Sequence, residues 1–169
     1  MNREAARRMS EDFRSRATTR RRGNSFEDFT PGRLFRHHWG RSITEGDNAL
    51  FSTLTLSFNP LYFNAEYARA HGHPGAVVNP MLVWTTVFGL SVEDLSEGGG
   101  LFLGAEDVVF HRPVYPGDTL TAESTVVGRR DSASDPTVGI VTWHTRGFNQ
   151  KQELVIDYQR TNRVRKRGG

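Results

Sequence analysis

NPMLVWTTVFGLSV, residues 79–92, is apolar almost all round and predicts a buried central helix. Asn79 can cap its start through the side-chain oxygen, and Pro80 then occupies the first helical position, where a missing N–H costs nothing. Thr85 and Thr86 form its widest polar stripe. The segment is too short to span a bilayer, which takes about 20 apolar residues. We therefore expect protein to cover this helix on most sides.

Four strand-like runs follow the helix and predict an antiparallel sheet. Each is rich in alternating or β-branched residues, and turn-forming residues such as Pro116-Gly117-Asp118 separate them. With a first strand near Phe35, they give five or six strands around one helix, an α+β arrangement. The runs are LFLGAEDVVFHRPV (101–114), TLTAESTVVGRR (119–130), TVGIVTWHTRGFN (137–149) and ELVIDYQRTNRV (153–164).

Two shorter helices are expected ahead of the central helix. Thr44 and Asp47 resemble a capping box at the start of TEGDNALFSTLTL, which has apolar residues at helical spacing. Asn59-Pro60 ends this helix, and Asn64 caps the next one. The irregular segment 57–62 lies between them. It is a candidate site, because loops held between ordered elements often carry functional residues.

Composition and charge restrict the class of protein. The 169 residues include no cysteine, so disulfides, thiolate zinc sites and a cysteine nucleophile are excluded. The net charge is only +3, and the basic residues concentrate at the two ends. We expect an Arg-rich tail over residues 1–24 with a short helix near Glu4–Arg14, one domain over 25–164 and a basic tail over 165–169. The basic runs lack interleaved aromatic residues except Phe13, so we expect no nucleic-acid partner.

No targeting or metal-binding pattern is found in the sequence. The first residues lack the apolar core of a secretory signal, and no apolar run is long enough to anchor the chain in a membrane. We expect a cytoplasmic protein. The six histidines show no H-E-x-x-H or similar spacing, so we predict no metal and no cofactor.

The order of helix and strands, with RPVYPGDTL at the hairpin after the first of the four runs, resembles the hotdog fold. More narrowly, the chain is similar to the MaoC family of (R)-specific enoyl-thioester hydratases and dehydratases. The first of three matching pieces especially resembles the branch that hydrates mesaconyl-CoA or dehydrates methylmalyl-CoA. The resemblance runs from about Phe35 to Arg163, and its pieces are HHWGRSITEGDNALFSTLT, NPLYFNAEYA and FHRPVYPGDTLTAESTVV.

The resemblance implies a single hotdog domain, with a long central helix wrapped by a five- to six-stranded antiparallel sheet. It also implies an acyl thioester of CoA or of a carrier protein as the ligand. We expect a homodimer or a higher homo-oligomer of dimers, because two hotdog sheets that join edge to edge remove exposed strand edges and form the ligand cleft between them.

The site segment departs from the family pattern. In the family it reads D-x-N-P-L-H, and the Asp and His activate the water that adds to, or leaves from, Cβ of the thioester. Here it reads S-F-N-P-L-Y, with Ser57 at the Asp position and Tyr62 at the His position. Neither residue type is a base at neutral pH. The family's central helix tends to start with a small residue whose N–H binds the thioester oxygen, but Pro80 has no N–H. The acidic position that follows D-x-N-P-L-H in the family is Asn64 here.

These departures leave several roles open. Tyr62 either fills the space of the missing imidazole or donates a proton to a thioester carbonyl or an enolate. Arg112 could bind CoA phosphates, as could Arg129-Arg130. The hydroxyl of Ser57 can instead satisfy the loop backbone, and Asn59 is expected to structure the turn. The predicted catalytic residues are Tyr62, Ser57 and Asn59, and the predicted substrate-binding residues are Asn79, Pro80 and Arg112.

We therefore expect a MaoC-like hydratase or dehydratase, a hydro-lyase, with an altered acid–base site. A catalytically silent acyl-binding or partner subunit is the alternative, because both the acid and the base of the family are replaced. A hotdog thioesterase is a further alternative, since fold alone does not fix function.

Overall fold

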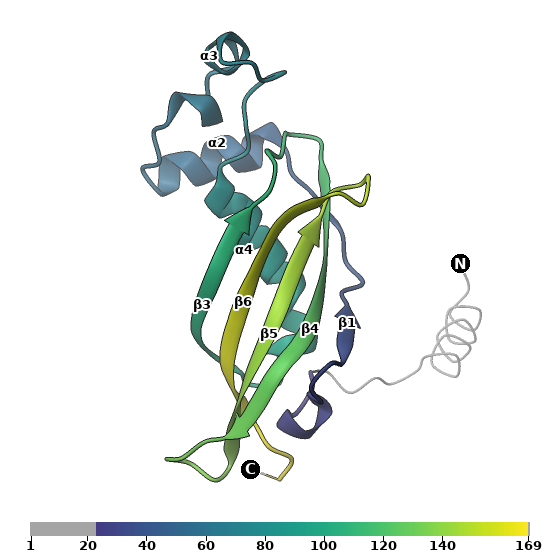
Figure 1. Cartoon of the computed structure of the whole chain (residues 1–169). Coiled ribbons are helices and arrows are strands. Elements are labelled where there is room, and N and C mark those ends of the chain that lie inside the picture. The colour runs from purple at the N-terminus through teal and green to yellow at the C-terminus, as the bar shows by residue number, and fades with distance from the viewer. Residues whose placement is uncertain (1–22, 169) are drawn as a thin grey trace, which may run out of the picture.

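The computed structural model describes residues 23–168, so the predicted helix near Glu4–Arg14 lies outside the described part. It shows one α+β domain, with a long helix along one face of a twisted sheet (Figure 1). The elements are η1 (Phe26–Asp28), β1 (Leu34–Arg36), β2 (Arg41–Ser42), α2 (Glu45–Leu54), η2 (Pro60–Tyr62), α3 (Ala65–Ala70), α4 (Pro80–Leu90), α5 (Val92–Leu95), β3 (Leu101–Phe110), β4 (Thr119–Asp131), β5 (Val138–Phe148) and β6 (Leu154–Arg165).

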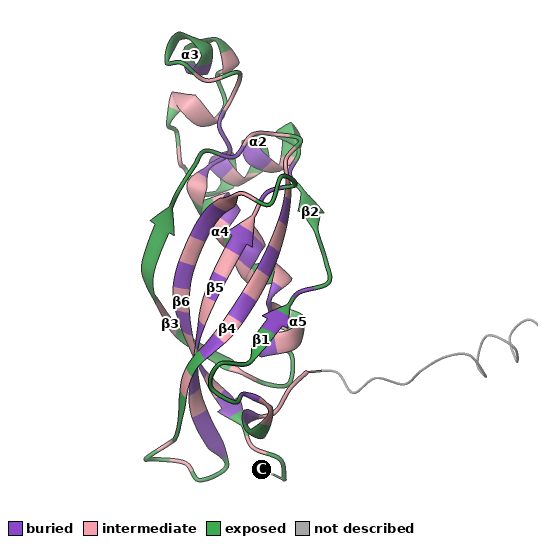
Figure 2. Ribbon diagram, turned by 45° about the vertical axis from the view of Figure 1, so that its right-hand side comes forward, coloured by how far each residue is buried: buried purple, intermediate pink, exposed green. Residues whose placement is uncertain are grey.

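The sheet has six antiparallel strands, which confirms the predicted number. Their order is β1-β4-β5-β6-β3, and β2 also pairs with β4. Buried and less buried residues alternate along β4, β5 and β6, as the period of two in their sequences predicts (Figure 2). By contrast, β3 lies at one edge and is largely exposed along its length. The face and free edge of β3 therefore lack cover within residues 23–168.

One side of α4 packs on the sheet. Val83 and Val87 are buried in a core cluster that includes Leu120 and Ile156 from the sheet. Gly147 permits this close approach, because a Cβ atom at that position would lie 2.6 Å from Cγ2 of Val87. The other side is open, with Met81 exposed. The expectation that protein covers α4 on most sides is thus met only on the sheet side within the described residues.

The helix starts follow the predicted capping residues. At the start of α2, the hydroxyl of Thr44 accepts from the N–H of Asp47 at 3.1 Å, and the carboxylate of Asp47 accepts from the N–H of Thr44 at 2.8 Å. The N–H and the hydroxyl of Thr44 both donate to the Asp47 carboxylate and lower its pKa. Asn64 caps α3 in the same manner, because its side chain accepts from the N–H of Tyr67. The capping-box prediction is confirmed.

The basic residues at the C-terminus pack against the domain. β6 continues to Arg165, one residue beyond the predicted domain boundary. Lys166 pairs with Asp131 at 2.6 Å, and Arg167 pairs with Asp28 in η1. Up to residue 168, the predicted basic tail is therefore held by carboxylates of the fold.

Candidate active site

A pocket of about 360 Å³ lies where η2, the start of α4 and the connection from β3 to β4 meet. Its volume is in the range of small-ligand sites, about 300–1,000 Å³. Tyr62, Pro80 and Arg112 line it, so the structure brings three of the predicted site residues together. His73 and His111 line the same pocket, and the remaining lining side chains are apolar.

Asn59 sets the turn that carries Tyr62. The side-chain oxygen of Asn59 accepts from the N–H of Leu61 at 3.1 Å, and its carbonyl accepts from the N–H of Tyr62 at 3.0 Å. Pro60 occupies the first position of this 3₁₀ turn, as its fixed φ favours. Asn59 does not line the pocket, and its contacts give it the turn-forming role expected from the sequence.

A buried amide joins the segments around the pocket. Asn48 in α2 is only 2% exposed, and its Nδ2 donates to the carbonyls of Tyr62 at 2.7 Å and Val77 at 3.0 Å. Its Oδ1 accepts from the N–H of Asn79 at 2.8 Å. Asn48 therefore fixes η2 against the start of α4. The sequence contains no signal for Asn48, because the apolar residues of this helix at helical spacing are Ala49, Leu50 and Leu54.

We expect Asn48→Ala to lower the free energy of unfolding by about 2–4 kcal/mol, because it leaves three buried backbone groups without partners. Urea unfolding of the variant measures this loss. Thr53→Ala is a matched control on the same helix, since Thr53 is exposed and its hydroxyl donates only to the carbonyl of Ala49 in its own helix. Equal stability of the two variants would show that Asn48 does not hold these segments together.

The N–H groups in the first turn of α4 all donate to Asn79. Pro80 has none, the N–H of Met81 donates to Oδ1 of Asn79 at 3.0 Å, and the N–H groups of Leu82 and Val83 donate to the Asn79 carbonyl at 2.9 and 3.1 Å. Asn79 is 1% exposed and does not line the pocket. It shapes the site as the helix cap, and the first turn of α4 has no free N–H for a ligand.

The other predicted residues lie in different surroundings. The N–H of Ser57 donates to the carbonyl of Ser52 at 2.9 Å, and Ser57 does not line the pocket. Arg112 does line it, but its Nη1 pairs with Glu153 at 2.6 Å. Arg129 donates to the carbonyls of η1 residues, so it holds η1 on the sheet and does not extend toward the pocket.

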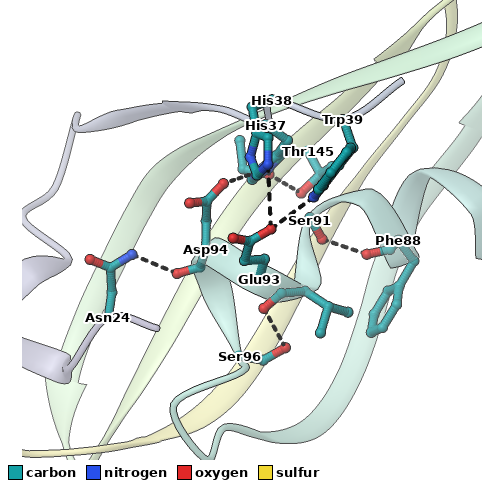
Figure 3. Close-up of polar contacts among 12 residues, drawn as sticks. Asn24, His37, His38, Trp39, Phe88, Ser91, Glu93, Asp94, Ser96 and Thr145 are labelled. Atoms are coloured by element: carbon teal, nitrogen blue, oxygen red, sulfur yellow. Dashed lines mark hydrogen bonds and ion pairs between the residues drawn. The ribbon is translucent and has the colours of Figure 1, made fainter. Parts of the chain in front are cut away.

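A second polar cluster lies between α5 and the sheet (Figure 3). Nδ1 of His37 is 2.6 Å from Oδ2 of Asp94, Nε2 is 2.9 Å from Oγ of Ser124, and that oxygen is 2.8 Å from the hydroxyl of Thr145. The order of groups is that of a Ser-His-Asp triad. Ser124 is 0% exposed, however, so no substrate reaches it. This cluster ties the segment after β1 to α5 and the sheet.

We expect acid to weaken the fold through His37. Burial lowers its pKa below 6.5, against the opposing effect of Asp94. The unfolded chain therefore binds the proton more readily, and the free energy of unfolding decreases as the pH falls below about 6.5. Urea unfolding across this range should show a smaller decrease for His37→Gln than for the wild type, whereas the exposed control His38→Gln should follow the wild type. An unchanged slope in His37→Gln would contradict this assignment.

Residues 23–168 contain neither a metal-binding cluster nor a membrane-spanning helix. No group of three or more His, Cys, Asp or Glu side chains in this range is placed to hold a metal ion. None of the helices in the same range has the length and apolarity needed to cross a membrane.

Comparison with known proteins places these features in context. A family model described as mesaconyl-CoA hydratase matches residues 6–169. The mesaconyl-CoA hydratase of Haloarcula marismortui is 40% identical over 153 residues, which cover 90% of this chain and 43% of the relative. The β-methylmalyl-CoA dehydratase of Chloroflexus aurantiacus is 41% identical over 145 residues, covering 86% of this chain and 41% of that protein.

A solved structure agrees with these matches. A MaoC domain protein from Chloroflexus aurantiacus superposes with a TM-score of 0.84 and 39% identity, over 89% of this chain and 43% of that one. The predicted MaoC-like hotdog fold is confirmed. The chain spans less than half the length of these relatives.

Proposed function

Because the chain belongs to the mesaconyl-CoA hydratase family, we propose that it adds water to, or removes water from, an acyl thioester of CoA or of a carrier protein. The observation that carries this proposal is the pocket in which Tyr62 and Pro80 meet, at the junction of η2 and the start of α4. Its apolar walls suit a short acyl chain. Arg112 stands at the same pocket and is the proposed contact for the charged part of the ligand.

Tyr62 is the proposed proton donor. When water adds to Cβ, electrons move through Cα to the thioester oxygen, and the resulting enolate must take a proton at Cα. A phenol that delivers this proton is restored by the proton that the added water releases, so one side chain can serve both steps. Ser57 does not line the pocket, which supports Tyr62 over Ser57 as the proposed proton donor.

A substrate panel tests the proposed activity. The full chain is incubated with mesaconyl-CoA and crotonyl-CoA, with the corresponding hydroxyacyl-CoAs and with saturated acyl-CoAs. We expect the absorbance of the enoyl thioester to decrease in hydration and to increase in dehydration. Release of free thiol would identify a thioesterase instead, and no change with any compound would favour a silent subunit.

The silent subunit stays a second candidate because of the helix start. All N–H groups in the first turn of α4 are used by Asn79, and Pro80 supplies none, so the usual donor to the thioester oxygen is missing. A chain of this kind would bind the acyl group and complete the site of a homologous partner subunit that retains D-x-N-P-L-H. Turnover that depends on adding such a partner subunit would support this role.

We further propose that a second copy of the chain covers the edge strand β3 and the open side of α4. Both β3 and α4, through Met81, carry exposed apolar residues, and a free strand edge of this kind pairs readily with another strand. The apolar residues of β3 that are exposed are Leu101, Phe102, Leu103, Val108, Val109 and Phe110.

Light scattering is expected to give about twice the 19.1 kDa mass of one chain. Leu103→Lys in β3 should lower this mass toward that of a monomer, because it places a charge at the proposed junction. Val127→Lys is the control, since Val127 is equally exposed but lies on β4. A folded wild-type monomer at micromolar concentration would contradict the proposed dimer.

A further inference from the structure

We propose, on the basis of the function proposed above, that His73 binds the thioester carbonyl oxygen by donating the N–H of its Nε2. This donor would take the place of the backbone N–H that Pro80 lacks. Negative charge develops on that oxygen when water adds to Cβ, and a fixed donor aimed at it stabilises the transition state.

The position of His73 supports this role. It lines the same pocket as Tyr62 and Pro80. Its Nδ1 lies 3.0 Å from the hydroxyl of Tyr115, and the two rings are tilted with centroids 6.1 Å apart. Among residues 23–168 its Nε2 has no hydrogen-bond partner in the unliganded chain. This nitrogen is therefore free for a ligand.

In the proposed arrangement, the phenol of Tyr115 donates to Nδ1 of His73 and thereby selects the tautomer. Burial, together with the nearby Asp118, raises the pKa of the Tyr115 phenol above 10, so the phenol keeps its proton at neutral pH. A protonated phenol can donate to Nδ1, and a neutral imidazole that accepts at Nδ1 carries its hydrogen on Nε2. Tyr115 is thus a positioning residue, which presents His73 as a donor.

Backbone hydrogen bonds hold the segment of His73 against the pocket. The N–H of His73 donates to the carbonyl of Ala68 at 3.0 Å. Further along, the N–H of Val77 donates to Leu61 at 2.8 Å, and the N–H of Val78 donates to Val114 at 2.9 Å. Tyr62 and Tyr115, which follow Leu61 and Val114, are therefore held close to this segment. A donor fixed in this way needs little reorganisation when charge develops.

The other cationic or imidazole groups of the pocket each pair with a carboxylate. Nε2 of His111 lies 2.7 Å from Oδ1 of Asp157, and Nη1 of Arg112 lies 2.6 Å from Oε1 of Glu153. Tyr62 has the proton-transfer role in the proposed reaction. Of the pocket-lining groups, His73 is the one with a ring N–H donor that no carboxylate holds.

Steady-state kinetics, with a thioester that the wild type converts, test whether His73 is the donor to the thioester oxygen. We expect His73→Ala to lower kcat about 10²–10³-fold, the usual cost of losing one oxyanion donor. His73→Gln places an amide N–H near the position of Nε2 and should retain more activity than His73→Asn, which does not reach it. His71→Gln is the control, because His71 is exposed and stacks on Tyr67. Full activity in His73→Ala, or equal losses in the Gln and Asn variants, would overturn the proposal.

Nitrogen-15 NMR of the imidazoles tests the same assignment without turnover. Free wild-type protein should show His73 with its hydrogen on Nε2, and Tyr115→Phe should shift this population toward the other tautomer. Butyryl-CoA, which lacks both a double bond and a hydroxyl, should shift the Nε2 resonance on binding. A hydrogen on Nδ1, failure to bind butyryl-CoA, or binding without this shift would each refute the role of His73. Binding with the shift but no turnover of any thioester would refute the proposed hydratase and leave His73 as a ligand donor.

Discussion

Tyr62→Phe is expected to lower turnover by about 10²-fold or more while the melting temperature stays unchanged. The substitution removes the hydroxyl and keeps the ring that lines the pocket. The contacts that hold this residue are made by its backbone, since Asn48 donates to its carbonyl and its N–H donates to Asn59. If Tyr62 had only a structural role, the Phe variant would therefore lose little turnover.

The effect on kcat and KM separates the two roles of Tyr62. A proton donor acts in the transition state, so kcat should fall while KM changes little. Tyr67→Phe is the control, because Tyr67 lies on α3 and stacks on His71 outside the pocket. If turnover hardly changes in Tyr62→Phe, its ring only fills the space of the missing imidazole, and the proton donor must be sought elsewhere.

The elements that could be predicted from the sequence are those with local causes. Capping by Thr44, Asn64 and Asn79 acts over two or three residues, so these helix starts were correctly predicted. The strands were also correctly predicted, because alternation along each strand reflects its two faces. Segment 57–62 was predicted as a candidate site from its position between two helices, and the resemblance to a family pattern then singled out Tyr62.

The residues that sequence reasoning missed act over long distances in the chain. Asn48 bonds to Val77 and Asn79, His37 to Asp94 and Ser124, and His73 to Tyr115. No spacing rule links these partners, because only the tertiary fold brings them together.

Helix α2 shows why pattern alone misleads. Its apolar residues at helical spacing predicted the helix, but Leu50 and Leu54 are exposed, and the buried residues are the polar Asn48 and Ser52. Hydrogen bonds, not apolar area, decide which side of α2 faces inward. This arrangement leaves Leu50 and Leu54 of α2 without cover among residues 23–168.

Restoring the family's acid and base is the second test with a large expected effect. Ser57→Asp combined with Tyr62→His rebuilds D-x-N-P-L-H, yet we expect little gain in hydration of crotonyl-CoA. Pro80 still has no N–H at the start of α4, and the N–H groups of the following residues remain bound to Asn79. Without that donor, charge on the thioester oxygen is stabilised less.

Adding Pro80→Gly to this double variant is expected to raise hydration about 10²–10³-fold, because the first helical residue then offers an N–H beside the pocket. Pro80→Ala in the same background restores the same N–H without the flexibility of glycine, so the two triple variants should gain alike. Asn79 would still cap the helix in both, and circular dichroism should confirm an intact fold. Strong hydration by the double variant alone would disprove the importance of the missing N–H. A gain with glycine but not alanine would instead assign the effect to backbone freedom at the start of α4.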